Sequence, residues 1–123
     1  MRAGNIAAAV DGAKDRAAPE QPVRRMKWDM KIRFYIDPET GMPHIHRHGV
    51  REDEVEDVLS SPGEDRPGKE GSRIAIGQTM GGRYLRVIYV PDPDPESVFV
   101  ITAYELKGKP LTAYRRRRRR RKG

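Results

Sequence analysis

The chain of 123 residues contains no cysteine, so the sequence excludes disulfides and metal sites built from thiolates. It also lacks any apolar run that approaches the roughly 20 residues needed by a membrane-spanning helix. The longest apolar run near the start, Ile6 to Val10, is too short for the hydrophobic region of a signal peptide. Apolar residues make up only 36% of the chain, which allows one modest core. We therefore expect a soluble, cytoplasmic protein with one small domain and no membrane partner.

The net charge of +7 is carried by one end of the chain. Arg115 to Lys122 alone contribute +8, so all the other residues together sum to −1. Residues 26–114 hold 12 Lys and Arg against 15 Asp and Glu. The high isoelectric point therefore reflects a basic tail on a mildly acidic domain, and it does not indicate a basic surface on that domain.

Composition divides the chain into three parts. Residues 1–29 are rich in Ala, Gly, Pro and mixed charge without a sustained apolar period, so we expect a disordered N-terminal extension. Met26 and Met30 directly precede the first structured stretch, which leads to the hypothesis that the natural start lies at one of them. Residues 30–114 are predicted to form one domain, and residues 115–123 an arginine-rich tail.

Apolar residues in alternating or continuous runs predict four strands, at residues 32–36, 72–78, 83–90 and 98–104. The third of these is almost continuously apolar, so we expect a central strand that is covered on both faces. Thr79-Met80-Gly81-Gly82 is typical of a hairpin connection, because glycine takes a positive φ easily.

Two short helices are predicted around these strands. Apolar residues recur at helical spacing between Glu52 and Leu59, and Ser60-Ser61-Pro62-Gly63 ends this helix. Pro110 suits the first turn of a C-terminal helix, because its missing N–H needs no partner there. The predicted fold class is α+β: a small antiparallel sheet of about four strands, with a short helix before the meander, a C-terminal helix, and both helices on one face.

All three histidines, His44, His46 and His48, lie within five residues of one another, with Arg47 among them. Neutral imidazoles at this spacing could bind a transition metal, although further ligands would have to come from distant Asp or Glu residues. A second interpretation is acid–base chemistry, because histidine titrates near neutral pH and an adjacent guanidinium can hold a phosphate. A third is that His48-Gly49 opens the following helix and that His48 only packs locally.

Cleavage of RNA without a metal needs a base for the 2′-hydroxyl, an acid for the leaving 5′-oxygen and positive charge around phosphorus. The side chains that could supply these groups are His46, His48, Arg47, Arg73, Arg83 and Tyr104. Arg83 and Arg86 point to opposite faces of the sheet, so at most one of them joins Arg73 on a given face. The alternative for each arginine is an ion pair with an acidic residue such as Glu64, Asp65 or Glu70.

The arginine block predicts binding to polyanions. Each of its side chains can neutralise a phosphate, so binding to RNA or DNA should depend steeply on salt and be blind to sequence. The alternative is a terminus that contributes only solubility. The predicted phosphate-binding residues are Arg115, Arg116, Arg117, Arg118, Arg119, Arg120, Arg121 and Lys122.

Four stretches resemble the BrnT-type toxins and related small domains of the RelE/ParE-like group. Their shared features are a histidine, glycine and valine before an acidic helix, a strand with an arginine and a glycine, a hydrophobic strand, and a last strand ending near Thr-Ala. In this chain they correspond to residues 46–59, 71–77, 82–89 and 98–104.

The resemblance implies a compact RelE-like sheet that cleaves RNA without a metal or other cofactor and that an antitoxin protein neutralises. His48, Arg73 and Arg83 match the histidine and the two arginines of the pattern. Two positions depart from it: Glu105 stands where a cation follows the last strand in those toxins, and Arg51 replaces a Ser or Thr cap. The alternative function is therefore a non-catalytic binding or regulatory domain of the same fold, with affinity for polyanions in its tail.

Overall fold

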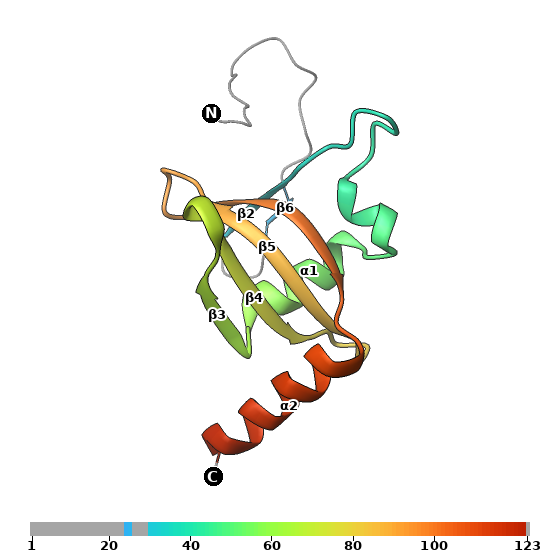
Figure 1. The fold of residues 1–123 in the computed structure, drawn as a ribbon. Coiled ribbons are helices and arrows are strands. Elements are labelled where there is room, and N and C mark those ends of the chain that lie inside the picture. Colours follow the sequence, from blue (N-terminus) through green and yellow to red (C-terminus); the bar gives the residue numbers. More distant parts are fainter. Residues whose placement is uncertain (1–23, 26–29, 123) are drawn as a thin grey trace.

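The computed structural model describes residues 24–25 and 30–122. Within this part of the chain one six-stranded sheet runs in the order β1-β2-β6-β5-β4-β3 (Figure 1). The elements are β1 (Arg24–Arg25), β2 (Lys31–Phe34), the 3-10 helix η1 (His44–His48), α1 (Glu52–Ser60), β3 (Glu64–Pro67), the 3-10 helix η2 (Lys69–Gly71), β4 (Arg73–Gln78), β5 (Tyr84–Pro91), β6 (Ser97–Glu105) and α2 (Gly108–Lys122). The predicted α+β class, with a helix before the meander and another at the C-terminal end, is confirmed.

Strands β4, β5 and β6 form the predicted antiparallel meander. Its first turn closes through the backbone N–H of Thr79, which donates to the carbonyl of Arg83, and Gly82 takes a φ of 96° there. Strand β2 departs from the predicted antiparallel pattern, because it pairs in parallel with β6. The whole meander separates these two strands along the chain, so no local turn signals their pairing.

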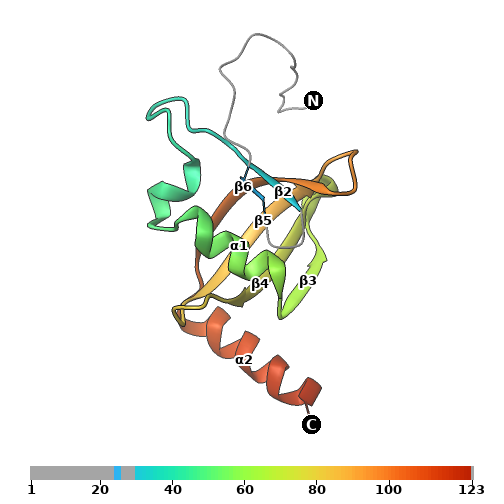
Figure 2. The ribbon, with the colours of Figure 1, turned by 180° about the vertical axis from the view of Figure 1, so that it is seen from behind.

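Helix α1 covers one face of the sheet (Figure 2). Its bounds match the prediction, and Val55 and Val58 on its inner side have no exposed surface. These residues pack against side chains at every second position of β5, where Leu85 and Val87 are fully buried. Alternation along a strand puts the intervening residues on the opposite face, and in β5 these are only partly buried. The prediction of a central strand is therefore correct, but one of its faces stays partly open.

Helix α2 packs on the opposite face from α1, which corrects the prediction of helices on one side. Tyr114 of α2 is 4% exposed and packs against Ile76 of β4 and Leu106, which follows β6. Ile76 directly follows Ala75, which belongs to the core under α1. Successive residues of a strand point to opposite faces, so the sheet lies between the two cores. The helix continues through the arginine block without a break at Arg115.

Other parts of the fold were not predicted. Strand β3 pairs with β4 at the edge of the sheet, although its residues, Glu64–Pro67, include no strongly apolar side chain that would signal a strand. The prediction of disorder for residues 1–29 lies outside the described residues, apart from Arg24–Arg25, which form β1.

Gly63 sets how closely α2 approaches the sheet. A Cβ atom there would lie 1.8 Å from the Tyr114 hydroxyl oxygen and 3.0 Å from its Cζ atom. We expect Gly63→Ala to lower the free energy of unfolding by about 2 kcal/mol, because the buried ring must move. Gly81→Ala is the control, since its Cβ would find Thr79 Oγ1 as the nearest atom, at 3.8 Å. Urea denaturation of both variants checks this, and equal losses would contradict it.

Candidate functional site on the open face of the sheet

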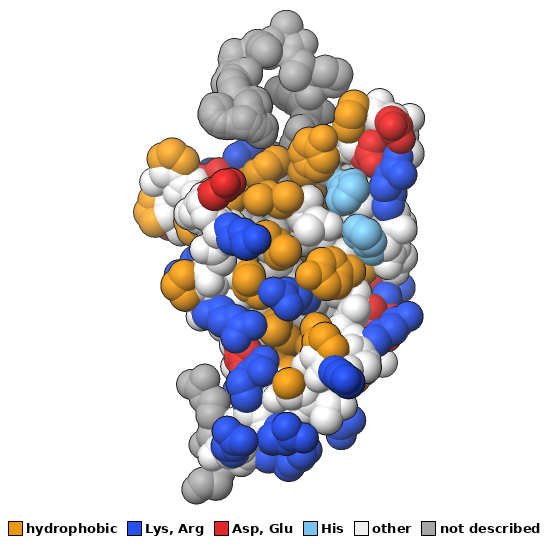
Figure 3. Space-filling view, in the orientation of Figure 1, with side chains coloured by type: hydrophobic (Ala, Val, Ile, Leu, Met, Phe, Trp, Pro, Cys, Tyr) orange, Lys and Arg blue, Asp and Glu red, His pale blue; other side chains and the backbone are white. Residues whose placement is uncertain are grey.

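The face of the sheet away from α1 carries a mixed group of cationic, hydrophobic and histidine side chains (Figure 3). Arg86 of β5 is directly opposite Tyr104 of β6 in the antiparallel register. Side chains paired in this way start about 5 Å apart and project to the same side of the sheet. Both residues alternate with buried core positions, Val87 and Ala103, so they lie on the open face.

The 3-10 helix η1 brings two histidines to this face. Its buried Ile45 anchors it to the core, and Gly49 ends it in a left-handed conformation with a φ of 72°. The His44 and His48 ring centroids lie 5.3 Å apart, and the His48 and Tyr104 centroids lie 5.9 Å apart. Tyr35 extends the row, with its ring 5.9 Å from that of His44. Two imidazoles and two phenols therefore form a continuous row beside β6.

A carboxylate contacts His44 within this row. His44 Nδ1 lies 3.4 Å from Asp37 Oδ2, which also accepts a hydrogen bond from Arg47. The hydrogen bond from Arg47 is the main reason that the pKa of Asp37 is lowered, and the backbone N–H of Glu39 adds to the effect. Asp37 therefore remains charged and can orient the His44 ring, as carboxylates do for imidazoles in acid–base sites.

Arg86 has a hydrogen-bonding group that no neighbour satisfies. Among the residues that the structure describes, the buried Nε of Arg86 and the buried Oγ1 of Thr102 have no hydrogen-bond partner. Thr102 is opposite Ile88, two pairs along from Arg86 and Tyr104, so both groups belong to the open face. Buried polar groups without partners are rare in folded proteins, and a bound ion or a catalytic role is among their explanations. An anion at this position would satisfy the guanidinium.

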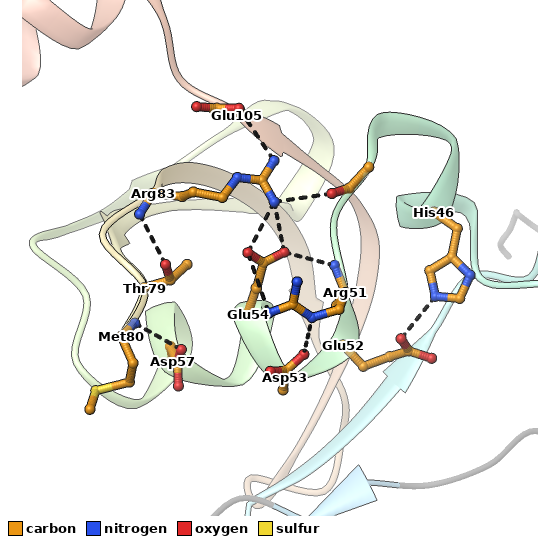
Figure 4. Close-up of polar contacts among 11 residues, drawn as sticks. His46, Arg51, Glu52, Asp53, Glu54, Asp57, Thr79, Met80, Arg83 and Glu105 are labelled. Carbon is orange, nitrogen blue, oxygen red and sulfur yellow. Dashed lines mark hydrogen bonds and ion pairs between the residues drawn. The ribbon is translucent and has the colours of Figure 1, made fainter.

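Arg83 is engaged elsewhere, at the junction of η1 and α1 (Figure 4). Its Nη1 donates to both carboxylate oxygens of Glu54, at 2.9 and 3.0 Å, and to the carbonyl of Gly49 at 3.0 Å. Its Nη2 lies 3.3 Å from Glu105, the residue that departs from the toxin pattern. These contacts give Arg83 a structural role in holding η1 against the sheet.

Three other predicted residues also have acidic partners. Arg73 Nε donates to Asp65 at 2.9 Å, which is the ion pair weighed above as its alternative. The same Asp65 accepts a hydrogen bond from Tyr89, and burial raises the pKa of that phenol to about 12. His46 contacts Glu52 at 2.8 Å, and Arg47 donates to Glu39 at 2.5 Å as well as to Asp37.

Of the predicted catalytic residues, the structure brings together only His48 and Tyr104. His44, Tyr35 and Arg86 join them; His44 belonged to the predicted histidine cluster, whereas Tyr35 and Arg86 were not among the predicted catalytic residues. The alternation of β5 places Arg86 on the face opposite Arg83, but the sequence does not show which of these faces α1 covers. Nor does the sequence show the position of η1 beside β6, because it depends on the long-range packing of Ile45.

The arginine block of α2 divides into anchored and exposed side chains. Arg117 donates to Glu64 at 3.0 Å, and Arg118 donates to the carbonyl of Gly63 at 2.9 Å. Arg115 lies over the Tyr84 ring, with its Cζ 5.9 Å from the centroid. The exposed members are Arg115, Arg116, Arg119 and Arg120. The side chains of residues 121 and 122 lie outside the described part, so their predicted phosphate contacts stay predictions.

The fold and this face define a small α+β domain with an open sheet that carries a histidine–tyrosine row beside an arginine. The chain matches the family described as Domain of unknown function (DUF4258) over residues 44–105, about half of its length, and it belongs to this family. The match contains η1 and the meander, and it ends before α2.

No curated protein matches the chain. No solved structure matches it either. Within the described residues, no group of three or more His, Asp and Glu side chains is arranged to hold a metal ion. Nor does any helix in that same part of the chain have the length and apolar character needed to cross a membrane.

Proposed function

We propose that the open face binds single-stranded RNA and cleaves it without a metal ion, as a toxin-like ribonuclease. The observation that carries this proposal is the row of His44, His48 and Tyr104 beside Arg86, whose buried Nε has no hydrogen-bond partner among the described residues. Two imidazoles at 5.3 Å can serve as a base and an acid on the two sides of one phosphodiester. Arg86 provides a cation for the negative charge that develops on the phosphoryl oxygens.

The proposed reaction is an internal transesterification. One imidazole removes the proton from the 2′-hydroxyl, whose oxygen attacks phosphorus and forms a new P–O bond. The bond from phosphorus to the 5′-oxygen breaks, and the other imidazole donates a proton to that oxygen. The products are a 2′,3′-cyclic phosphate and a 5′-hydroxyl. Asp37 orients His44 and Tyr104 positions His48, so each imidazole has a neighbour that fixes its ring.

The proposal includes a partner protein. The BrnT-like pattern implies an antitoxin, and an inhibitor of this chemistry has to cover the open face that holds His48 and Arg86. Exposed hydrophobic residues border that face, including Tyr35 at 38% and Ile101 at 36% exposure, and they supply apolar area for such a contact.

A second candidate is a non-catalytic domain that binds polyanions through α2. The ion pairs of Arg73 with Asp65 and of Arg83 with Glu54 favour it, because they remove two cations from contact with a substrate. In this case RNA affinity depends on the exposed arginines of α2 and is the same for cleavable and non-cleavable strands.

The test uses the full chain, a labelled single-stranded RNA and an excess of EDTA. We expect cleavage products that end in 2′,3′-cyclic phosphate, and we expect Arg86→Ala to lower the rate about 100-fold, the typical effect of losing one group that stabilises transition-state charge. Arg33→Ala is the matched control, because Arg33 is a cation of the same sheet that already pairs with Asp92 at 2.7 Å. RNA binding without any cleavage supports the non-catalytic domain. Equal rates for Arg86→Ala and Arg33→Ala contradict the proposed site.

A further inference from the structure

A cleft separates α2 from the end of α1 and the β4–β5 hairpin. Its volume is 550 Å³, which is within the usual range for sites that hold small molecules. The residues that line it are Ser61, Pro62, Gly63, Gln78, Tyr84, Tyr114, Arg115, Arg118 and Arg119. None of these residues is acidic, and three are arginines. The cleft therefore suits an anion that also carries an aromatic or polar group.

The arginines reach the cleft because of helical spacing. Arg115 and Arg119 are four residues apart, so they lie on one side of α2, and Arg118 lies next to them. Arg118 donates to the carbonyl of Gly63, which fixes this wall of the cleft. Arg115 and Arg119 are exposed, so their guanidiniums can rearrange to grip a phosphate from the open side.

Two aromatic rings, Tyr84 and Tyr114, are part of the cleft lining. The Tyr84 and Tyr114 rings meet at 65° with centroids 6.0 Å apart, and Tyr84 is the more exposed of the two. Aromatic faces beside arginines are the means by which proteins stack the bases of single-stranded nucleic acids. Gln78 and Ser61 add hydrogen-bonding groups at the rim.

One residue of the cleft lining, Tyr84, lies on the same strand as Arg86 of the candidate site. Tyr84 is two residues before Arg86 on β5, so both side chains are on the open face and start about 7 Å apart. A strand of RNA that enters at α2 therefore passes Tyr84 and then reaches Arg86 and the histidine row.

We propose that this cleft binds one nucleotide of single-stranded RNA next to the scissile phosphate, and this inference rests on the proposed function. Arg115 and Arg119 hold the phosphate of that nucleotide, and Tyr84 holds its base. The cleft thereby sets which phosphodiester lies at Arg86. The family match ends at Glu105, so this nucleotide site depends on a helix outside the matched region.

The test measures binding separately from cleavage, with a single-stranded RNA that carries 2′-O-methyl groups and has no attacking hydroxyl. Fluorescence anisotropy compares Arg115→Ala/Arg119→Ala with Arg116→Ala/Arg120→Ala at one salt concentration. Both double variants remove two exposed arginines of α2, so their loss of non-specific attraction to phosphate is the same. We expect the first to bind about 10-fold more weakly than the second, because it also loses the directed phosphate contacts.

The outcomes separate this inference from the proposed function. Equal affinities of the two double variants, or no binding by the unaltered chain, overturn the cleft as a nucleotide site even if RNA is cleaved. A weaker Arg115→Ala/Arg119→Ala variant supports the cleft even if the unaltered chain cleaves nothing, and in that case only the ribonuclease proposal fails. Tyr84→Leu, which keeps the apolar packing, should weaken binding about 5-fold, since stacking of a base on an aromatic ring is lost.

Discussion

Replacing His48 with alanine is expected to slow RNA cleavage about 1,000-fold. The imidazole of His48 lies between His44 and Tyr104, where it can exchange a proton with the reacting 2′- or 5′-oxygen. Loss of a positioned acid or base typically lowers a rate by factors of about 100 to 10,000. Single-turnover rates with saturating protein measure the chemical step directly. The affinity for a 2′-O-methyl strand should change little, because His48 is one of many groups on the face.

The three histidines supply their own control for this prediction. His46 is engaged by Glu52 at 2.8 Å, so His46→Ala should leave the cleavage rate within about twofold of the unaltered chain. His48 is exposed, so its removal should also leave thermal stability nearly unchanged. Equal losses of rate for His46→Ala and His48→Ala would remove the row from the mechanism.

Glu54→Ala is expected to give the largest loss of stability among single substitutions of polar residues at this junction, about 3 kcal/mol. The Glu54 side chain is 5% exposed, and it accepts two hydrogen bonds from Arg83. It also accepts a hydrogen bond from the backbone N–H of Arg51 at 3.0 Å, which caps the first turn of α1. Its removal leaves a partly buried guanidinium without its main carboxylate and a helix without this cap. Urea denaturation gives the change in the free energy of unfolding.

Asp53→Ala is the matched control for Glu54→Ala. Asp53 is in the same turn of α1 and contacts Arg51 at 3.0 Å, but its side chain is 58% exposed. Exposed ion pairs contribute little, so this variant should lose less than about 1 kcal/mol. A double variant, Glu54→Leu with Arg83→Met, should recover part of the stability lost in Glu54→Ala, because apolar residues can replace a buried pair. Similar losses for Glu54→Ala and Asp53→Ala would show that burial at this junction has no effect.

The local pattern of the sequence was enough to predict most of the secondary structure. Alternating apolar residues identified β4, β5 and β6, and helical spacing located α1 with the bounds that the structure has. The turn at Thr79 to Gly82 follows from the conformational freedom of glycine. These features depend on residues that are neighbours in the chain, so a single sequence contains the information.

The partners of the charged residues could not be predicted in the same way. Arg83 finds Glu54 at a separation of 29 residues, and Arg117 finds Glu64 at a separation of 53 residues. Such pairs depend on how β3, α1 and α2 meet in space, and each arginine had several acidic candidates along the chain. The interpretation of Arg73 and Arg83 as phosphate ligands came from the resemblance to the BrnT-type toxins. Predicting Arg86 as a site residue would have required knowing which face of the sheet α1 covers.

The two ends of α2 differ in stability, because only its first half packs on the sheet that separates the two cores. Leu111 and Tyr114 press the beginning of the helix onto β4, while the turns that follow carry one positive charge at every position. Like charges four residues apart on a helix repel one another. The last turns of α2 are therefore destabilised by repulsion between guanidiniums, and dissolved salt or a bound phosphate chain reduces this repulsion. The end of this helix can therefore fray at low salt and become more ordered at high salt, while the structure of the sheet does not change.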